Sequence, residues 1–172
     1  RIEAGTFLIA CAATGGSVTL KNVNHHHLTD IISKLKLSNV TINRINEDLE
    51  IVSKGDKIPV NLKTDVYPGF PTDLQAQWVA YMSTILGNSK VEDTIYLDRF
   101  THIPELNRLG ADIKMDNNIA IINGVDKLYG ANIMSTDIRA SACLIIASMC
   151  AEGESHLSRI YHIDRGYENI EL

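Results

Sequence analysis

The sequence predicts an α/β domain built from three repeated units, with buried helices in the centre and small sheets on the outside. Three observations predict this arrangement. An apolar helix, a glycine and a short strand recur in that order at residues 7–23, 78–96 and 144–162. The helix that opens each unit lacks a polar face, which is typical of buried helices. The strands alternate between apolar and polar residues, so one face of each sheet meets water.

The remaining elements of each unit recur in the same order. A second helix is predicted at 26–35 and 101–111, and 165–172 begins a third copy. Alternating residues around Asn46-Glu47-Asp48 and Asp116-Asn117-Asn118 predict two hairpins. Extended stretches at 58–64 and 130–136 then lead into the next helix. The third unit has no hairpin, so we expect its missing strands to come from outside this segment.

Composition limits the possible functions. A chain of 172 residues that is 45% hydrophobic suits one compact domain with a real core. The formal net charge of −5 argues against a general nucleic-acid binder. The longest apolar helix, around 138–151, is too short to cross a bilayer. Cys11, Cys143 and Cys150 lie in apolar runs without a CxxC pair, which favours buried free thiols and a cytoplasmic location.

Two stretches place a carboxylate at the start of a buried helix. Thr72-Asp73 follows a rigid Pro-Gly-Phe-Pro turn, and Thr136-Asp137 opens the next apolar helix. A threonine cap followed by a carboxylate stabilises a helix start, so a structural role explains both stretches. A carboxylate fixed there can also accept a proton from a hydroxyl within hydrogen-bond reach. The residues alone leave both interpretations open.

Three arginines are candidates for an anion site. Arg99 and Arg165 each follow a predicted strand and an Asp and precede a predicted helix, and Arg139 follows Asp137. They could be exposed side chains paired with a neighbouring Asp. They could also converge with Asp73 at one end of the domain, because ligands bind at strand-to-helix junctions of open α/β folds. A guanidinium suits phosphate and carboxylate groups, so convergence predicts a site for an anionic substrate with a hydroxyl.

The histidines do not predict a metal site. Three adjacent side chains, His25-His26-His27, cannot all face one ion. His162 ends the third predicted strand, where it could tune the arginine site or simply pack against its neighbours. No P-loop, GxGxxG or zinc spacing occurs in the sequence.

These residues lie in longer strings that resemble one enzyme family. The strings are RIEAGTFLIACAATGG, VYPGFPTDLQAQ, DRFTHIPELNRLGADI, STDIRASA and RIYHIDRGYENIE. With nearly constant spacing along all 172 residues, the sequence resembles the UDP-N-acetylglucosamine enolpyruvyltransferases, also called UDP-N-acetylglucosamine 1-carboxyvinyltransferases.

The resemblance implies a two-domain fold and a reaction. Each domain would be an inside-out α/β barrel of three βαβαββ units. The enzyme would transfer the enolpyruvyl group of phosphoenolpyruvate to the 3'-hydroxyl of UDP-N-acetylglucosamine and release phosphate, through a tetrahedral intermediate and without metal or organic cofactor. This is the first committed step of peptidoglycan synthesis, and so of cell-wall biogenesis and cell division. The implied partners are the two substrates and the protein's other domain, with no nucleic acid and no membrane.

The resemblance also implies roles for single residues. Asp73 matches the general base that contacts the sugar 3'-hydroxyl, and Ile95 matches a residue that lines the nucleotide-sugar site. Arg165 matches the arginine that binds phosphoenolpyruvate when the enzyme closes. The remaining matches are interdomain-cleft residues that orient the intermediate: Asp137, Arg139 and Arg99.

The chain differs from the family pattern at one dipeptide, and it matches only one of the family's two domains. Leu97-Asp98 stands where the family has Glu-Asn. Residues 1–172 match a single domain, the C-terminal-half domain, incomplete at both ends. The other domain, which carries a lysine, the catalytic cysteine loop and most uridine contacts, has no match here. We therefore expect the segment alone to be inactive.

Two alternatives stay open at this point. A repeat scaffold without catalytic function would not need its acidic and basic residues at one end of the domain. The sister family that acts on shikimate 3-phosphate, the 3-phosphoshikimate 1-carboxyvinyltransferases, shares the fold but not the PGFPTD and HIDRGYE strings.

Overall fold

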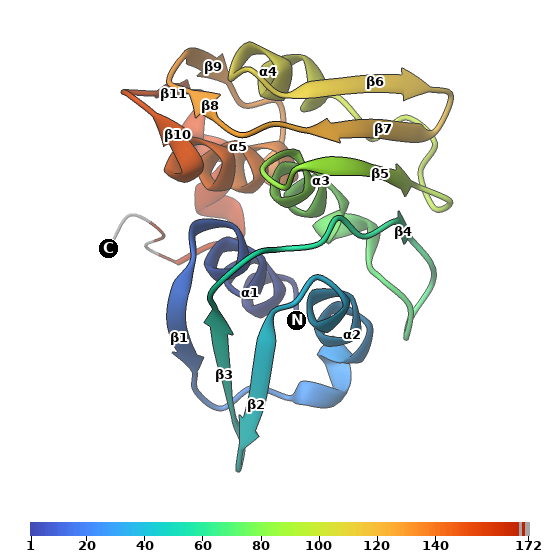
Figure 1. Cartoon of the computed structure of the whole chain (residues 1–172), viewed down its shortest axis with the longest axis vertical. Helices are drawn as coiled ribbons and strands as arrows, with labels where there is room; N and C mark the ends of the chain where they lie inside the picture. Colours follow the sequence, from blue (N-terminus) through green and yellow to red (C-terminus); the bar gives the residue numbers. More distant parts are fainter. Residues whose placement is uncertain (169, 171–172) are drawn as a thin grey trace.

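Three helices lie next to one another at the centre of the molecule (Figure 1), in a computed structural model that describes residues 1–168 and 170. They are α1 (Ile2–Thr14), α3 (Gln75–Ser83) and α5 (Ile138–Cys150), and each contacts the other two. All nine residues of α3 are buried, polar Gln75 as well as apolar Trp78. The expectation of central, buried helices is therefore confirmed most fully for α3.

The first unit folds as its sequence pattern predicts. After α1 come β1 (Gly16–Leu20), the 3-10 helix η1 (His25–Leu28), α2 (Thr29–Leu37), β2 (Thr41–Ile45), β3 (Asp48–Ser53) and β4 (Leu62–Lys63). The first sheet has the order β1-β3-β2 and is antiparallel throughout. Asn46 takes a left-handed φ of 58° in the hairpin turn, a conformation that asparagine tolerates better than most residues.

The second unit repeats this order. It contains η2 (Thr72–Leu74), α3, β5 (Gly87–Glu92), α4 (Ile103–Arg108), β6 (Asp112–Asp116), β7 (Ile119–Gly124), β8 (Leu128–Tyr129) and β9 (Asn132–Met134). Its sheet has the order β4-β5-β7-β6. Asn117 turns the second hairpin with a φ of 53°. Both predicted hairpins are confirmed.

Neighbouring units are joined by parallel strand pairs. β4 of the first unit pairs in parallel with β5 of the second. The third unit contains α5, β10 (Ala151–Glu152), β11 (His156–Ser158) and η3 (Ile160–Arg165). Its two strands pair in parallel with β8 and β9 of the second unit. Each later unit thus receives strands from the unit before it.

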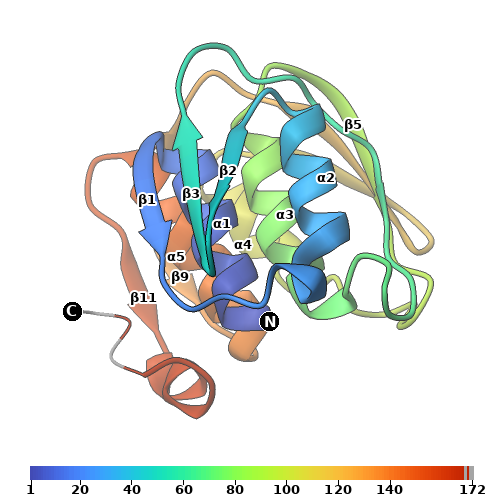
Figure 2. The same cartoon turned by 90° about the horizontal axis from the view of Figure 1, so that it is seen from below.

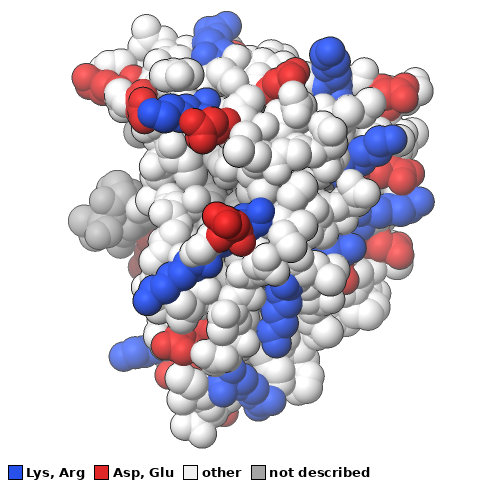
Figure 3. Space-filling view, viewed as in Figure 1, with Lys and Arg blue, Asp and Glu red and all other residues white. Residues whose placement is uncertain are grey.

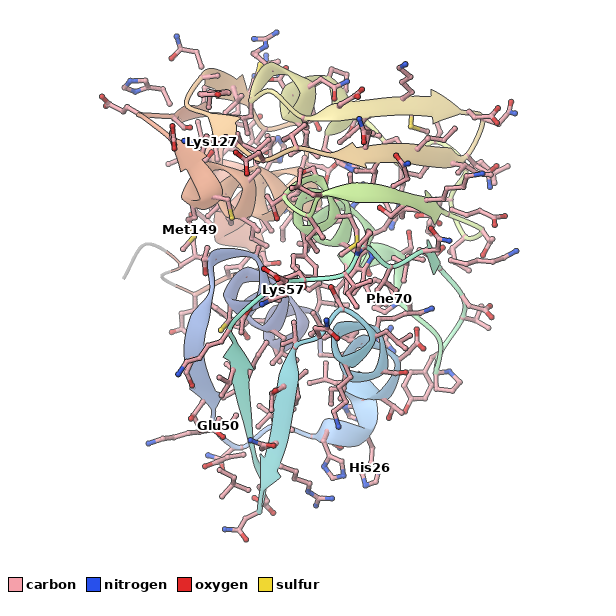
Figure 4. All side chains as sticks on the ribbon, viewed as in Figure 1. His26, Glu50, Lys57, Phe70, Lys127 and Met149 are labelled. Carbon is pink, nitrogen blue, oxygen red and sulfur yellow. The ribbon has the colours of Figure 1, made fainter. Side chains whose placement is uncertain are left out.

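The core lies between the helices and the inner faces of the sheets. Burial alternates along β3 and β7, as expected for strands with one face on the core. Trp78 is fully buried and meets Phe70 and Tyr81 edge-on, each at a centroid distance of 5.5 Å. Figure 4 shows Phe70 beside α3, whereas His26 lies at the outer end near η1. Phe70 therefore anchors the loop that leads to Asp73.

Three parts of the sequence-based prediction are wrong. The strand that follows α3 ends at Glu92, so Ile95 to Leu97 belong to a loop. Arg165 is the last residue of a 3-10 helix and does not follow a strand, and His162 lies inside the same helix. No helix follows at 166–168 or 170, and the remainder of the predicted third helix, residues 169, 171 and 172, lies outside the described residues.

The surface carries no strong charge bias on the face seen in Figure 3, where acidic and basic side chains are interspersed. Cys11 and Cys143 are buried free thiols, and Cys150 is partly buried. In the part of the chain that the structure describes, no helix has the length and apolar character needed to cross a membrane.

Candidate active site

The three central helices start at the same end of the molecule (Figure 2). A cavity of about 290 Å³ opens there, and residues from all three helix starts line it. Glu3 comes from α1, Asp73 from the turn before α3, and Arg139 from α5. Gly166 and Tyr167, which follow η3, complete the same wall. The predicted convergence of charged residues at one end is therefore observed for Asp73 and Arg139.

Asp73 is held by an arginine and does not cap its helix. Arg99 Nη1 lies 3.0 Å from Asp73 Oδ1, and the Asp73 side chain is 49% exposed. The other oxygen, Oδ2, has no hydrogen-bond partner among the described residues. Thr72 does not act as the predicted N-cap, because the cap position falls on Pro71 and no side chain there bonds the helix. The predicted N-cap at Thr72 is therefore wrong, whereas Asp73 does lie in the first turn, as predicted.

Arg99 is fixed from two sides. It forms the ion pair with Asp73, and its guanidinium lies 3.7 Å from the centroid of the Tyr96 ring, within cation–π range. Its side chain is 24% exposed. The second of the two sequence interpretations, in which this arginine joins the acidic residues of the site, agrees with this geometry. Arg99 does not pair with its neighbour Asp98 in the described structure.

Asp137 does cap its helix. Its Oδ1 accepts hydrogen bonds from the backbone N–H groups of Arg139, at 2.8 Å, and Ala140, at 3.1 Å. Its Oδ2 lies 3.1 Å from Arg139 Nη2. Both oxygens are occupied, so the carboxylate is committed to the start of α5 and to Arg139.

The charges of this end of the domain act on one another. Burial lowers the pKa of the Arg139 guanidinium. The carboxylate of Asp137 opposes this lowering most strongly, and the positive charge of Arg99 adds to it. Asp73 and Asp93 also oppose it. Buried His102 lies close to the same group. Burial lowers its pKa to about 3, with Arg139 adding to the shift and Asp137 opposing it.

Arg165 lies next to the cavity but takes no part in the ion pairs of Asp73 and Asp137 among the described residues. It is the last residue of η3 and directly precedes Gly166, which lines the cavity. Among residues 1–168 and 170 its side chain is exposed and makes no ion pair with Asp73 or Asp137. Tyr167, which follows, is buried, and its hydroxyl lies 2.8 Å from Thr6 Oγ1.

Ile95 lies on the loop that joins β5 to α4, and 36% of its surface is exposed. Two residues of this region were missed by sequence analysis. Asp93, fully buried, binds the backbone of the Ile95 loop. Tyr167 lines the cavity, and its only signal in the sequence is its place within the family-like string RIYHIDRGYENIE. A carboxylate directly after a predicted strand was the available signal for Asp93.

The other histidines lie outside the cluster. Within the described residues no group of histidine, cysteine or carboxylate side chains could hold a metal ion. His162 packs against the ring of Tyr161, with 4.3 Å between the centroids. A second cavity of about 560 Å³ shares Glu3 with the first and holds none of the predicted site residues.

Similar proteins agree with this picture along the whole chain. The UDP-N-acetylglucosamine 1-carboxyvinyltransferase of Chlorobium chlorochromatii is 48% identical over 172 residues, which cover 100% of this chain and 41% of that protein. The enzyme of the same name from Geotalea uraniireducens is 50% identical over 173 residues and is covered to 41%. The chain thus spans about two fifths of the length of these relatives, and the resemblance seen in the sequence is confirmed.

Solved structures show the same fold. The enolpyruvyl transferase NikO from Streptomyces tendae superposes with a TM-score of 0.85 at 20% identity, over 96% of this chain and 40% of that one. EPSP synthase from Acinetobacter baumannii gives a TM-score of 0.69 at 14% identity, over 96% and 42%. The family described as EPSP synthase (3-phosphoshikimate 1-carboxyvinyltransferase) matches residues 1–172. With a match along its whole length, the chain belongs to the EPSP synthase family of mixed α/β enolpyruvyl transferase domains.

Proposed function

We propose that this chain is one domain, the C-terminal-half domain, of a UDP-N-acetylglucosamine 1-carboxyvinyltransferase. The intact enzyme transfers the enolpyruvyl group of phosphoenolpyruvate to the 3'-hydroxyl of UDP-N-acetylglucosamine, the first committed step of peptidoglycan synthesis. The observation that carries the proposal is the meeting of Asp73, Arg99 and Arg139 at the start of the central helices. A repeat scaffold has no need of this cluster, so the geometry argues against the scaffold alternative.

Asp73 is the general base of the proposed reaction. Arg99 fixes one carboxylate oxygen, while the other has no partner among the described residues and can accept the proton of the 3'-hydroxyl. The sugar oxygen then adds to the enol carbon of phosphoenolpyruvate, whose methylene carbon takes up a proton. Loss of phosphate and of a proton from the same methyl group regenerates the double bond. The proton donor to carbon belongs to the absent domain, so the 172 residues alone are inactive.

The arginines supply the positive charge that two anionic substrates require. Ile95 lies beside the nucleotide sugar, and Arg139 and Arg99 face the developing intermediate together with Asp137. When the two domains close, Arg165 of η3 joins these residues and binds phosphoenolpyruvate. Three helix starts at the cavity add the positive ends of their dipoles, which favour anions. No metal and no organic cofactor takes part.

The domain is an inside-out α/β barrel with α1, α3 and α5 as its inner helices. One edge of β1 has no partner strand among the described residues, which supports the proposal that a further strand comes from outside the 172 residues. In the other two units the corresponding strands, β5 and β11, receive a parallel partner from the preceding unit, whereas β1 pairs only with β3 among the described residues. The intact protein therefore adds a parallel strand to β1.

The test of the proposed function uses the full-length protein that contains this chain. Asp73→Asn should lower kcat by about 10²–10⁴-fold, as measured by phosphate release, because it removes a positioned general base. Its Kd for UDP-N-acetylglucosamine should change far less. Asp126→Asn, an exposed carboxylate outside the cluster, serves as the matched control. Near-normal turnover by Asp73→Asn would remove it from this role, and stabilisation by shikimate 3-phosphate but not by the nucleotide sugar would favour the sister activity.

A further inference from the structure

Asp93 is a buried carboxylate on which four donors converge. Its side chain is fully buried at the end of β5. Oδ1 accepts hydrogen bonds from Thr64 Oγ1 at 2.8 Å and from the backbone N–H groups of Ile95 and Tyr96, both at 3.0 Å. Oδ2 accepts one from Thr72 Oγ1 at 2.6 Å. A buried carboxylate is costly unless such donors satisfy it, so this arrangement is specific and not incidental.

The backbone of Asp93 is fixed as well. Its N–H donates to the carbonyl oxygen of Asn118 at 3.1 Å, and its own carbonyl accepts from Asn118 Nδ2 at 3.1 Å. Thr64 directly follows β4, and Asn118 lies in the turn between β6 and β7. Asp93 is thereby anchored to the edge of the second sheet at which β5 ends and β7 begins.

The side chain connects this edge to two parts of the candidate site. Thr72, whose hydroxyl donates to Asp93 Oδ2, directly precedes Asp73. The Thr72 hydroxyl also lies 3.4 Å from Arg99 Nη1, the same nitrogen that pairs with Asp73. A chain of polar contacts therefore runs from the Asp93 carboxylate through the Thr72 hydroxyl and the Arg99 guanidinium to the Asp73 carboxylate. Through its other oxygen Asp93 holds the loop that carries Ile95.

We propose that Asp93 is a positioning residue that sets the distance between the nucleotide-sugar contact at Ile95 and the general base Asp73. This inference rests on the proposed function, in which these two residues touch the same substrate. Asp93 does not touch the substrate. It acts through Thr72 on the proton-transfer geometry and through the Ile95 loop on binding.

The two routes can be separated by substitution. Asp93→Asn keeps the shape but offers one strong acceptor atom in place of two, so at least one of the four donors loses its partner. Thr72→Val removes only the hydroxyl that leads to Arg99 and Asp73. Thr72→Ser retains that hydroxyl. Ser53→Ala is the stability control, since it removes a buried hydroxyl that donates to the Ala12 carbonyl, far from the cavity.

Steady-state kinetics of the full-length protein give the expected pattern. Thr72→Val should lower kcat by about 10- to 100-fold with little change in the KM for UDP-N-acetylglucosamine, because misplacement of a catalytic group has this cost. Asp93→Asn should lower kcat and raise that KM together. Thr72→Ser and Ser53→Ala should move neither constant by more than a few-fold. Backbone amide exchange at Ile95 and Tyr96 should accelerate in Asp93→Asn but not in Thr72→Val.

The failure of this inference differs from the failure of the proposed function. If the unmodified full-length protein transfers no enolpyruvyl group to UDP-N-acetylglucosamine, the proposed function fails and this inference fails with it. If the unmodified protein is active and Asp93→Asn keeps both constants, only the inference is overturned. Equal losses in Thr72→Val, Thr72→Ser and Ser53→Ala, in step with their melting temperatures, would reduce Asp93 to a stabilising residue.

Discussion

Acid should destabilise this domain through a single buried histidine. His102 is 2% exposed, and its Nε2 has no hydrogen-bond partner among the described residues. Burial lowers its pKa from 6.5 to about 3, with Arg139 adding to the shift and Asp137 opposing it. The folded state therefore keeps the imidazole neutral between these two values, whereas the unfolded state takes up a proton. Stability from this group is complete above pH 6.5 and falls as the pH drops toward 3.

The size of the effect follows from the two pKa values. At pH 5 the imidazole is almost fully protonated in the unfolded state and neutral in the folded state. The free energy of unfolding is therefore about 2 kcal/mol lower at pH 5 than at pH 8. Urea unfolding of the unmodified domain and of His102→Leu at both values measures it. The difference in unfolding free energy between pH 8 and pH 5 should be about 2 kcal/mol smaller in the variant. The same pH dependence in both proteins would show that His102 is protonated in the fold.

Three further perturbations have defined outcomes. Asp137→Ala should destabilise the domain by about 2 kcal/mol in urea unfolding, because α5 loses its N-cap and Arg139 loses its partner; an unchanged midpoint would contradict the cap. Gly124→Ala should cost about 1–3 kcal/mol, because a Cβ there would overlap the Ile85 carbonyl oxygen, and a variant of normal stability would mean that β7 can move away from the end of α3. In the full-length protein, Arg165→Ala should lower kcat/KM for phosphoenolpyruvate while the Kd for the nucleotide sugar is kept, and an unchanged dependence on phosphoenolpyruvate would refute its assignment.

Much of the fold could be predicted because its signals are local. The segment that became α3 is apolar or uncharged throughout, and its complete burial follows from that composition. Asn46 and Asn117 stand between alternating stretches, and each supplies the left-handed residue of a hairpin turn. The convergence of Asp73 with Arg139 required more than local pattern. It followed from treating the three helices as equivalent, so that their starts share one end.

Two of the errors, the strand predicted to run past Glu92 and the N-cap predicted at Thr72, share a physical cause in the side chain of Asp93. Ile95 and Tyr96 favour a strand by residue type. Their backbone N–H groups instead turn toward a carboxylate, so the strand ends at Glu92. Thr72 favours an N-cap, but its hydroxyl donates to the same carboxylate. The Thr72 contact joins residues 21 positions apart, and the Ile95 and Tyr96 contacts depend on one neighbouring side chain, so hydrophobic periodicity does not reveal them.

This competition also separates two helix starts that look alike in sequence. In Thr136-Asp137 the aspartate caps α5 and both its oxygens are occupied by the helix and by Arg139. In Thr72-Asp73 the carboxylate takes no capping bond, since the helix begins one turn earlier as a 3-10 segment after Pro71. Its Oδ2 is then free of the backbone, at a half-exposed position on the cavity. Of two equivalent carboxylates, one is held at its helix start and by Arg139, whereas the other keeps the accessible oxygen that the proposed general base requires.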